Sequence, residues 1–477
     1  MAKSVNNIII GHSSFRDKSN FVFEHQGNIY RAFTAESYKS VYEFLTSELY
    51  SRLKLEKKII ETKIVEEIGI DLPTGFEFIV QHKKIEIITY KDNWTFNMLK
   101  DAALLTLDIQ ENLLKEGLSL KDASVFNVQF INSKPIFIDL GSIVHSSQEI
   151  FWSGYRQFTE MFLNPLTISS SLQLNLQDFY MNTTRGIKSE TTWKFLKLRD
   201  KIKFNNLINI KLQINKNKIK VNRLKVDREL ENAGFNLKMR INQIKKLRKT
   251  VIKLEAPVLN TAWTDYSDRS HYESIEIQTK KKFIENAFAE KKYRTVIDWG
   301  CNDGLFSEYV VQQAEVVKVI SLDFDSQVLD KLYIHSKENN LKILPLVFDI
   351  SNPPVNYGFE NLERLNFLNL IDVDLNLAYA LVHHLFISDN LPWSKIIGLF
   401  IDSGDLIIEF PLPYDEKVLE LLNQKKEPAI YLREYNIDSF EEELKKYFKI
   451  SIKKNLNSRI LYYCENQSDE RRTKQTL

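Results

Sequence analysis

The chain has few cysteines, no long apolar run and almost no excess of charge. Its 477 residues include two cysteines, Cys301 and Cys464, so a disulfide framework is not expected and a reducing compartment is predicted. No apolar run approaches the length that crosses a bilayer, and Met1 to Ser14 lack the apolar core of a signal peptide. We therefore predict a cytoplasmic protein.

Overall composition points to an ordinary globular protein. The 65 basic and 63 acidic side chains leave a net charge of +2, which gives no global argument for binding nucleic acid. Apolar residues make up 43% of the chain and charged residues 27%. A chain of 477 residues predicts two or three domains with ample core volume.

The segment from Thr295 to Phe306 carries the clearest functional signal. An apolar run ends in Asp298, Gly300 and Gly304 bracket a tight turn, and a helical pattern follows. Glycines in such a loop let the backbone approach a ligand closely. A dinucleotide loop would have G-x-G-x-x-G and hold a pyrophosphate at the helix N-terminus. This loop lacks the G-x-x-G tail and has an acid before it. Both features suit an amino-acid moiety with a positive sulfonium better than a pyrophosphate.

Four further strands are predicted after this loop, at residues 316–323, 343–349, 375–381 and 405–411. The first ends in Asp323, whose carboxylate could accept both hydroxyls of a ribose. The next ends in Asp349, placed to meet an adenine amino group. Strands separated by helical segments predict a doubly wound α/β domain. The alternative is that these acids only end strands in some other doubly wound domain.

These residues resemble the class I methyltransferases that use S-adenosylmethionine (SAM), over residues 261 to 465. The resemblance implies SAM as the cofactor and a methyltransferase domain at residues 261–477. It places Asp298, Gly300 and Gly304 at the methionine end of the cofactor. Asn302 is a cofactor-binding candidate where the family usually has glycine, and asparagine tolerates the left-handed backbone such a turn needs.

Five more residues are candidates near this cofactor site. Trp263 and Tyr266 could form an aromatic lid facing the sulfonium, and packing is the alternative for Trp263. His383 and His384 follow the fourth strand, and one of them could take the proton of an acceptor hydroxyl. The alternative is a histidine that is buried or bonded to a loop carbonyl, because methyl transfer also works by alignment alone. Glu409 ends the fifth strand and is a second candidate for the acceptor pocket.

A second signal lies in the N-terminal third. Asp122 stands five residues before Asn127, a hairpin is predicted over residues 125–141, and Asp139-Leu-Gly closes it. This order resembles the catalytic and metal-binding loops of protein kinases. The resemblance implies that Asp122 orients an acceptor hydroxyl, while Asn127 and Asp139 hold the magnesium of Mg-ATP. The alternative is that Asp122 and Asn127 cap turns and Asp139 ends a strand, without any ligand.

The departures from the kinase pattern predict a degenerate kinase-like α+β domain over residues 1–168. No glycine-rich phosphate loop precedes the motif, and Arg31 is the best match for the strand lysine. Residues 84–96 are predicted as the strand and hinge, and residues 97–115 as the long helix after them. No metal site is predicted elsewhere, and phosphotransfer is an alternative activity.

The segment between these domains, residues 169–260, is predicted as a helical, basic linker or arm. Residues 201–254 hold sixteen Lys or Arg against three acids, with apolar residues at helical spacing. One interpretation is a helical hairpin or coiled-coil arm with lysines on its solvated face. The other is a surface for anionic membrane lipid or glycan, peripheral to the inner membrane. Nucleic acid is disfavoured because aromatic residues are scarce there.

Nearly the whole chain resembles a bacterial family of fused methyltransferases related to host-specific nodulation proteins. The landmarks include Trp94-Thr-Phe96, residues 98–104, Ala380-Leu-Val-His-His-Leu385 and Ser458-Arg-Ile-Leu-Tyr462. The resemblance implies SAM-dependent O-methylation of a surface glycan or small-molecule acceptor. Two alternatives remain, a bifunctional methyltransferase and phosphotransferase, and a scaffold that binds SAM and acts through its basic arm. The acceptor and the oligomeric state are left open.

Overall fold

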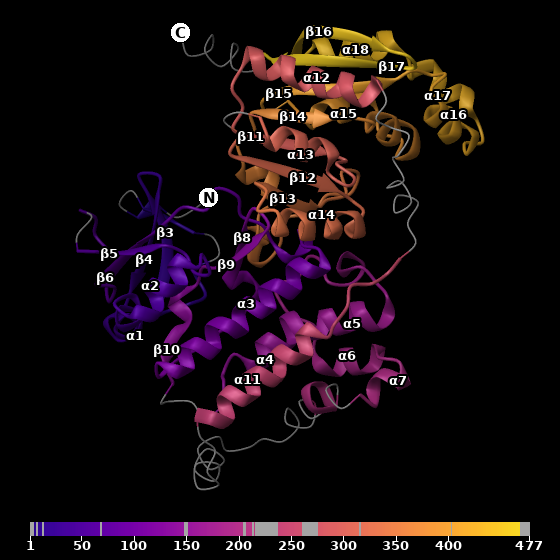
Figure 1. Ribbon diagram of the computed structural model, residues 1–477. Helices are drawn as coiled ribbons and strands as arrows, with labels where there is room; N and C mark the ends of the chain where they lie inside the picture. The colour runs from indigo at the N-terminus through magenta and orange to yellow at the C-terminus, as the bar shows by residue number, and fades with distance from the viewer. Residues whose placement is uncertain are drawn as a thin grey trace. The chain divides into compact units, whose positions relative to one another are not determined.

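The computed structural model describes most of the chain as two compact units (Figure 1). Residues 1–259 and 354–370 form the first unit, and residues 260–353 and 371–477 form the second. Residues 354–370, expected within the methyltransferase domain, thus cluster with the first unit, and the expected bounds at 168 and 260 stay predictions. The described residues are 4–5, 8–11, 14–66, 69–146, 151–203, 207–211, 214, 237–259, 275–313, 316–401 and 403–467.

The second unit is built on a seven-stranded mixed sheet in the order β13-β12-β11-β14-β15-β17-β16. Strands β11 to β15 are parallel, and β17 runs antiparallel to both β15 and β16. The five predicted strands are confirmed in type and order, which makes this unit a Rossmann-like α/β fold. The strands are β11 (Thr295–Trp299), β12 (Lys318–Asp323), β13 (Ile343–Val347), β14 (Leu375–Ala378), β15 (Asp405–Pro411), β16 (Phe448–Leu456) and β17 (Arg459–Asn466).

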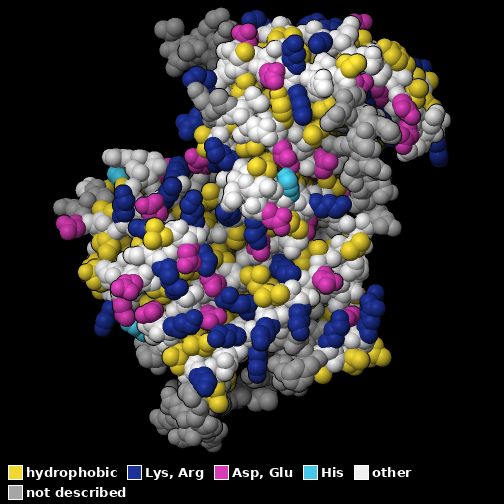
Figure 2. Space-filling model, viewed as in Figure 1, with side chains coloured by type: hydrophobic (Ala, Val, Ile, Leu, Met, Phe, Trp, Pro, Cys, Tyr) yellow, Lys and Arg dark blue, Asp and Glu magenta, His cyan; other side chains and the backbone are white. Residues whose placement is uncertain are grey.

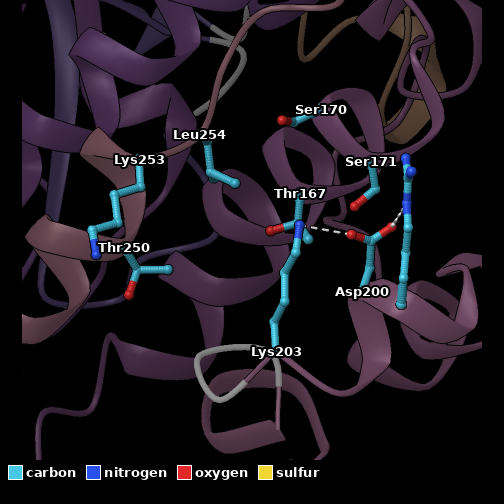
Figure 3. A pocket seen from close by; sticks show the side chains of 9 residues that line it. Thr167, Ser170, Ser171, Asp200, Lys203, Thr250, Lys253 and Leu254 are labelled. Carbon is cyan, nitrogen blue, oxygen red and sulfur yellow. Dashed lines mark ion pairs between the residues drawn. The ribbon is translucent and has the colours of Figure 1, made fainter.

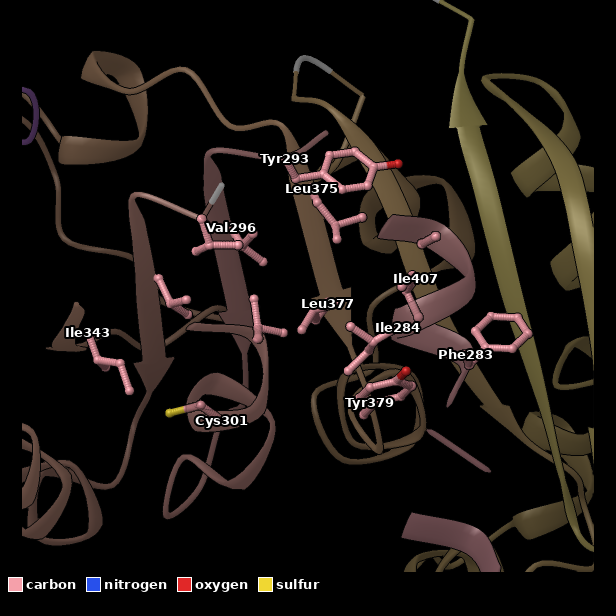
Figure 4. Packing of buried hydrophobic residues seen from close by; sticks show 14 of the residues in the cluster. Phe283, Ile284, Tyr293, Val296, Cys301, Ile343, Leu375, Leu377, Tyr379 and Ile407 are labelled. Atoms are coloured by element: carbon pink, nitrogen blue, oxygen red, sulfur yellow. The ribbon is translucent and has the colours of Figure 1, made fainter. Parts of the chain in front are cut away.

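Helices cover both faces of this sheet. On one face, Phe283 and Ile284 of α12 pack with Leu377 and Ile407 of the strands (Figure 4). On the other face, the ring of Phe440 from α18 lies 4.8 Å from that of Phe410 and 5.1 Å from that of Trp393. The helices are α12 (Ile275–Glu290), α13 (Leu305–Val311), α14 (Ser326–Glu338), α15 (Trp393–Gly398), α16 (Glu416–Asn423), α17 (Pro428–Glu434) and α18 (Ile437–Lys445).

The first unit begins with a six-stranded antiparallel sheet in the order β1-β2-β3-β4-β6-β5. The strand expected within residues 84–96 lies earlier, because residues 78–82 are the ones in register with β4. Two helices follow β4, and Thr34 and Ser47 cap their N-termini. The elements are β1 (Ser4–Val5), β2 (Ile8–Ile10), β3 (Asn20–His25), β4 (Asn28–Phe33), α1 (Ala35–Leu45), α2 (Glu48–Leu55), β5 (Thr62–Val65) and β6 (Phe78–His82).

The rest of the first unit is mainly helical. The long helix expected at residues 97–115 is confirmed as α3, and the predicted hairpin is confirmed as β8 and β9, turning at Asn132 with a φ of +54°. The hairpin is shorter than the expected residues 125–141, because Val125–Asn127 and Leu140–Ser142 form 3-10 helices. The elements are α3 (Phe96–Lys115), β7 (Leu118–Leu120), β8 (Val128–Ile131), β9 (Lys134–Phe137), β10 (Ile143–His145), α4 (Tyr155–Phe158), the π-helix η5 (Thr159–Leu163), α5 (Asn164–Leu172), α6 (Ser189–Phe195), α7 (Leu198–Lys201) and α11 (Leu237–Ile252).

Helix α11 is the longest described part of the basic segment that was expected to form a solvated arm. Its residues Ile244 and Leu247 are buried, and it packs along α3. Arg248 also pairs with Asp108 of α3 at 3.1 Å. This stretch is therefore helical as predicted, but one face is buried in the unit. None of the described helices is long and apolar enough to cross a bilayer.

Residues 354–370 join the first unit through polar contacts that the sequence did not indicate. Tyr357 donates its hydroxyl hydrogen to buried Asp92 over 2.7 Å. Glu363 accepts two hydrogen bonds from the guanidinium of Arg16, at 2.5 and 2.9 Å. The chain thus leaves the second unit between β13 and β14 and returns to it afterwards.

Candidate functional site

The glycine loop after β11 has left-handed backbone at three positions. The φ angles are +68° at Gly300, +49° at Asn302 and +85° at Gly304. A Cβ at Gly304 would lie 2.5 Å from a methyl carbon of Leu332, so glycine there lets α14 pack against the loop. A Cβ at Gly300 would lie 3.3 Å from Leu381. The loop therefore lies close to the segment that follows β14.

Asp298 is buried beneath this loop. Its carboxylate accepts a 2.6 Å hydrogen bond from the hydroxyl of Ser307, which also bonds the hydroxyl of Ser321 over 2.7 Å. Burial, and next the charge of Asp323, raise the pKa of Asp298 to about 7. In this structure Asp298 fixes the first turn of α13 beside the loop, and its contact with a cofactor stays a prediction.

Asp323 ends β12 with its carboxylate against the glycine loop. One oxygen accepts the backbone N–H of Asn302 and the other that of Asp325, each over 2.9 Å. Burial raises the pKa of Asp323 to about 6. The structure therefore brings together the loop and the acid that the sequence assigned to the ribose.

The residues beyond β12 and β13 line the same carboxyl edge of the sheet. Asp349 is exposed, and its carboxylate accepts hydrogen bonds from the backbone of Ser351 and Asn352 at 2.9 and 3.1 Å. Phe324 directly follows Asp323 and is 61% exposed. Phe324 was not among the predicted cofactor residues, although a large apolar residue immediately after a strand-end acid is a signal that the sequence contains.

The electrostatic environment of the loop is negative. Burial raises the pKa of the Cys301 thiol well above its usual value, and the charges of Asp323, Asp298 and Asp303 raise it further. These carboxylates would repel a negatively charged ligand at the loop and attract a positively charged one. The loop is therefore suited to a positively charged ligand and unsuited to a pyrophosphate.

The two histidines after β14 differ in exposure. The side chain of His383 is 1% exposed, and among the described residues its Nδ1 has no hydrogen-bond partner. Burial and the charges of His384 and Arg459 lower its pKa well below the usual value. His384 is half-buried, its ring lies 4.2 Å from that of His383, and burial lowers its pKa as well. Both imidazoles are therefore neutral at pH 7, and His384 is the more accessible.

Glu409 is fully buried in β15 and already bound within the protein. Its carboxylate lies 2.8 Å from the ammonium of Lys280 and 3.5 Å from the guanidinium of Arg459. It also accepts the backbone N–H of Ala380 over 2.6 Å. Ala380 has a φ of +48°, which is unfavourable for alanine. Glu409 thus holds the loop that leads to His384, a role that sequence reasoning missed together with Lys280 and Arg459.

Trp263 and Tyr266, the predicted aromatic lid, lie outside the described residues.

No protein-family model matches the chain. Over 465 residues it is 31% identical to the nodulation protein NoeA of Rhizobium meliloti (strain 1021). The alignment covers 95% of this chain and 95% of that protein. The chain belongs to the NoeA family. In this NoeA-family chain the match extends across both units and agrees with the family-level resemblance seen in the sequence.

Solved structures resemble part of this NoeA-family chain. The 16S rRNA methylase ArmA is 15% identical, with 44% of this chain and 100% of that chain covered and a TM-score of 0.28. An S-adenosylmethionine-dependent methyltransferase from Clostridium acetobutylicum ATCC 824 is 13% identical, with 43% and 99% covered and a TM-score of 0.29. Monomeric WbdD is 14% identical, with 40% of each chain covered and a TM-score of 0.28. Likenesses of this size carry no argument about activity.

The three kinase-like candidates lie on neighbouring loops of the first unit. The side-chain amide of Asn127 donates to the carbonyl of Asp122 over 3.5 Å, and the backbone N–H of Ile138 donates to the carbonyl of Asn127 over 2.9 Å. Next along the chain, Asp139 forms an ion pair with Arg31 of β4. The structure therefore brings together residues far apart in sequence, but a cation of the protein already neutralises Asp139.

Proposed function

We propose that this NoeA-family protein is a SAM-dependent methyltransferase that methylates an oxygen of a glycan or small-molecule acceptor. The observation that carries the proposal is the cluster of Asp298, Asp303 and Asp323 around a glycine loop. The loop lies at the carboxyl edge of the sheet, where strand order reverses between β11 and its neighbours β12 and β14. Open α/β sheets bind ligands at this switch point.

The residues present fit this cofactor. Gly300 and Gly304 give the loop its left-handed turns, and the acids around the loop favour a sulfonium over a phosphate. Each oxygen of Asp323 accepts one backbone N–H and keeps a lone pair for a ribose hydroxyl. The exposed ring of Phe324 offers a flat apolar face for an adenine. Asp349 follows β13, the strand next to β12 in the sheet. When bound, SAM supplies an electrophilic methyl group.

We assign proton acceptance from the acceptor hydroxyl to His384. Its lowered pKa keeps it neutral at pH 7, and it is less buried than His383. Glu409 acts through Ala380 and not on the acceptor, because its carboxylate is engaged by Lys280 and by that backbone N–H.

Titration of SAM into the full-length protein in a calorimeter tests the cofactor. We expect saturable binding at micromolar concentration, followed by methyl transfer in an acceptor screen that starts with glycans. Absence of binding to folded protein would refute the proposal. Binding without product from any acceptor would favour the scaffold alternative.

His384→Ala is expected to lower kcat about 100-fold and leave SAM binding unchanged, since general-base catalysis contributes about 10² to 10⁴ in rate. His335→Ala, on an exposed face of α14, is the matched control and should leave kcat unchanged. Because burial lowers the pKa of His384, the wild-type rate should fall with decreasing pH only at values lower than those at which an ordinary histidine protonates. A rate unaffected by His384→Ala would show that alignment alone suffices.

Phosphotransfer by the first unit is the alternative activity, and the ion pair of Asp139 with Arg31 disfavours it although Asp122, Asn127 and Asp139 lie on neighbouring loops. Arg31 competes with magnesium for Asp139, so we expect no calorimetric signal when Mg-ATP is titrated into the protein. Mg-ATP binding that disappears in Asp139→Asn would contradict this and favour the bifunctional enzyme. Asp101→Asn, on α3, is the control for loss of an acid in the same unit.

A further inference from the structure

An apolar surface surrounded by cations lies on the first unit at α6 and α7. We call residues 194–203 the α6–α7 surface. Three of its apolar side chains are strongly exposed, Phe195 at 56%, Leu198 at 79% and Ile202 at 71%. Figure 2 shows hydrophobic side chains next to Lys and Arg over these two helices. The cations of this surface are Lys194, Lys197, Arg199, Lys201 and Lys203.

The composition of this surface distinguishes between partners. Exposed apolar side chains in contiguity mark a binding surface. Interfaces between proteins are depleted of lysine, whereas a surface that binds anionic lipid combines lysines with large apolar residues. The single acid of the surface, Asp200, is buried and therefore does not oppose an approaching anion from outside. Charge complementarity thus favours an anionic bilayer over a protein.

A pocket of about 310 Å³ shares α7 with this surface (Figure 3). Asp200 lies 2.7 Å from the ammonium of Lys203 and 3.8 Å from the guanidinium of Arg199, and Lys253 adds a third cation. Three cations against one carboxylate leave the pocket positive. Its size is at the lower end for small-molecule sites, which suits a headgroup and not an acyl chain. The lining residues are Thr167, Ser170, Ser171, Arg199, Asp200, Lys203, Thr250, Lys253 and Leu254.

We propose that the α6–α7 surface binds an anionic lipid bilayer and that the pocket receives a headgroup phosphate. The side chains of Phe195, Leu198 and Ile202 enter the headgroup region, because burying them removes apolar area from water. Arg199 and Lys203 stay in reach of phosphates, since their side chains are 75% and 65% exposed. The proposed membrane site lies at residues 194–203, which overlap only at residues 201–203 with the basic segment 201–254 that one interpretation of the sequence gave to a membrane surface.

Cosedimentation of the full-length protein with vesicles tests this proposal. We expect binding to vesicles of phosphatidylcholine with phosphatidylglycerol, weaker binding at high salt, and none to phosphatidylcholine alone. The triple variant with serine at Phe195, Leu198 and Ile202 should bind at least about tenfold more weakly. Arg199→Gln and Lys203→Gln should each weaken binding about fivefold, the value of one juxtamembrane cation.

Matched controls separate this surface from general stickiness. Leu419→Ser with Ile430→Ser removes exposed apolar residues of the second unit, and Lys445→Gln with Lys454→Gln removes cations there. Both pairs should bind vesicles like the wild type, and circular dichroism melting verifies folding of every variant. Equal binding to neutral vesicles, or unchanged binding by the triple variant, would overturn the proposal. Two other results would also overturn it. One is a wild-type dimer in light scattering that becomes a monomer in the triple variant, with no vesicle binding by either protein. The other is saturable binding of inorganic phosphate by a protein that does not bind vesicles.

Discussion

Asp323→Ala is expected to weaken SAM binding at least about 100-fold, because two hydrogen bonds to a charged carboxylate are lost at about 1.5 to 3 kcal/mol each. The carboxylate of Asp323 bridges the glycine loop and the start of α14, where a ribose would lie. Calorimetric titration of SAM into wild type and variant measures the change. Asp372→Ala, an exposed acid before the amino end of β14, serves as the matched control and should bind SAM normally.

The same carboxylate predicts the direction of the pH dependence. Asp323 must be ionised to accept two hydroxyls, and its pKa in the free protein is raised to about 6. SAM affinity should therefore fall as this group protonates, and the loss from Asp323 alone should reach about tenfold by pH 5. Asp323→Asn should flatten this profile apart from the titration of Asp298, whose pKa is about 7. An unchanged affinity in Asp323→Ala would remove the ribose assignment.

Glu409→Gln is expected to destabilise the second unit by about 3 kcal/mol, because removing one partner of a buried ion pair leaves the other uncompensated. Lys280 loses its carboxylate while its side chain is 10% exposed, and Arg459 keeps Asp415 at 2.9 Å. The urea midpoint of this unit, followed by tryptophan fluorescence, should fall by about 1 M or more.

Two further variants make this prediction specific. Glu420→Gln breaks an exposed ion pair with Lys417 and should leave the midpoint unchanged. The double variant Lys280→Met with Glu409→Gln removes both buried charges and should be more stable than Glu409→Gln alone. A wild-type midpoint for Glu409→Gln would show that Glu409 is not structural and would return it to the acceptor pocket.

The local parts of the candidate site were readable in the sequence. The turn at Gly300 to Gly304 and the acid at Asp323 follow from short-range rules, because glycine at positive φ and strand-end acids act within a few residues. The sequence does not show that His384 is accessible and His383 is buried, because two adjacent histidines differ only in the residues that pack against them. The position of Phe324 directly after Asp323 can be read from the sequence, whereas the exposure of its ring cannot.

Residues that meet over long separations were decided by the tertiary structure. Lys280 reaches Glu409 and Arg31 reaches Asp139 because sheets and helices bring distant segments together. No local pattern encodes such pairs, since their partners lie more than 100 positions apart. The departure of residues 354–370 into the first unit is of the same kind, held by Tyr357 on Asp92.

The sequence by itself determined the succession of strands and helices along the second unit, the glycine loop and its acids, and the basic character of the middle segment. These depend on periodicity and on residue types that act locally. The tertiary structure decided which charges are neutralised, which histidine is accessible and which apolar side chains stay exposed at α6 and α7. Burial and pairing are properties of the packed chain, so they arise only when distant segments exclude water from one another.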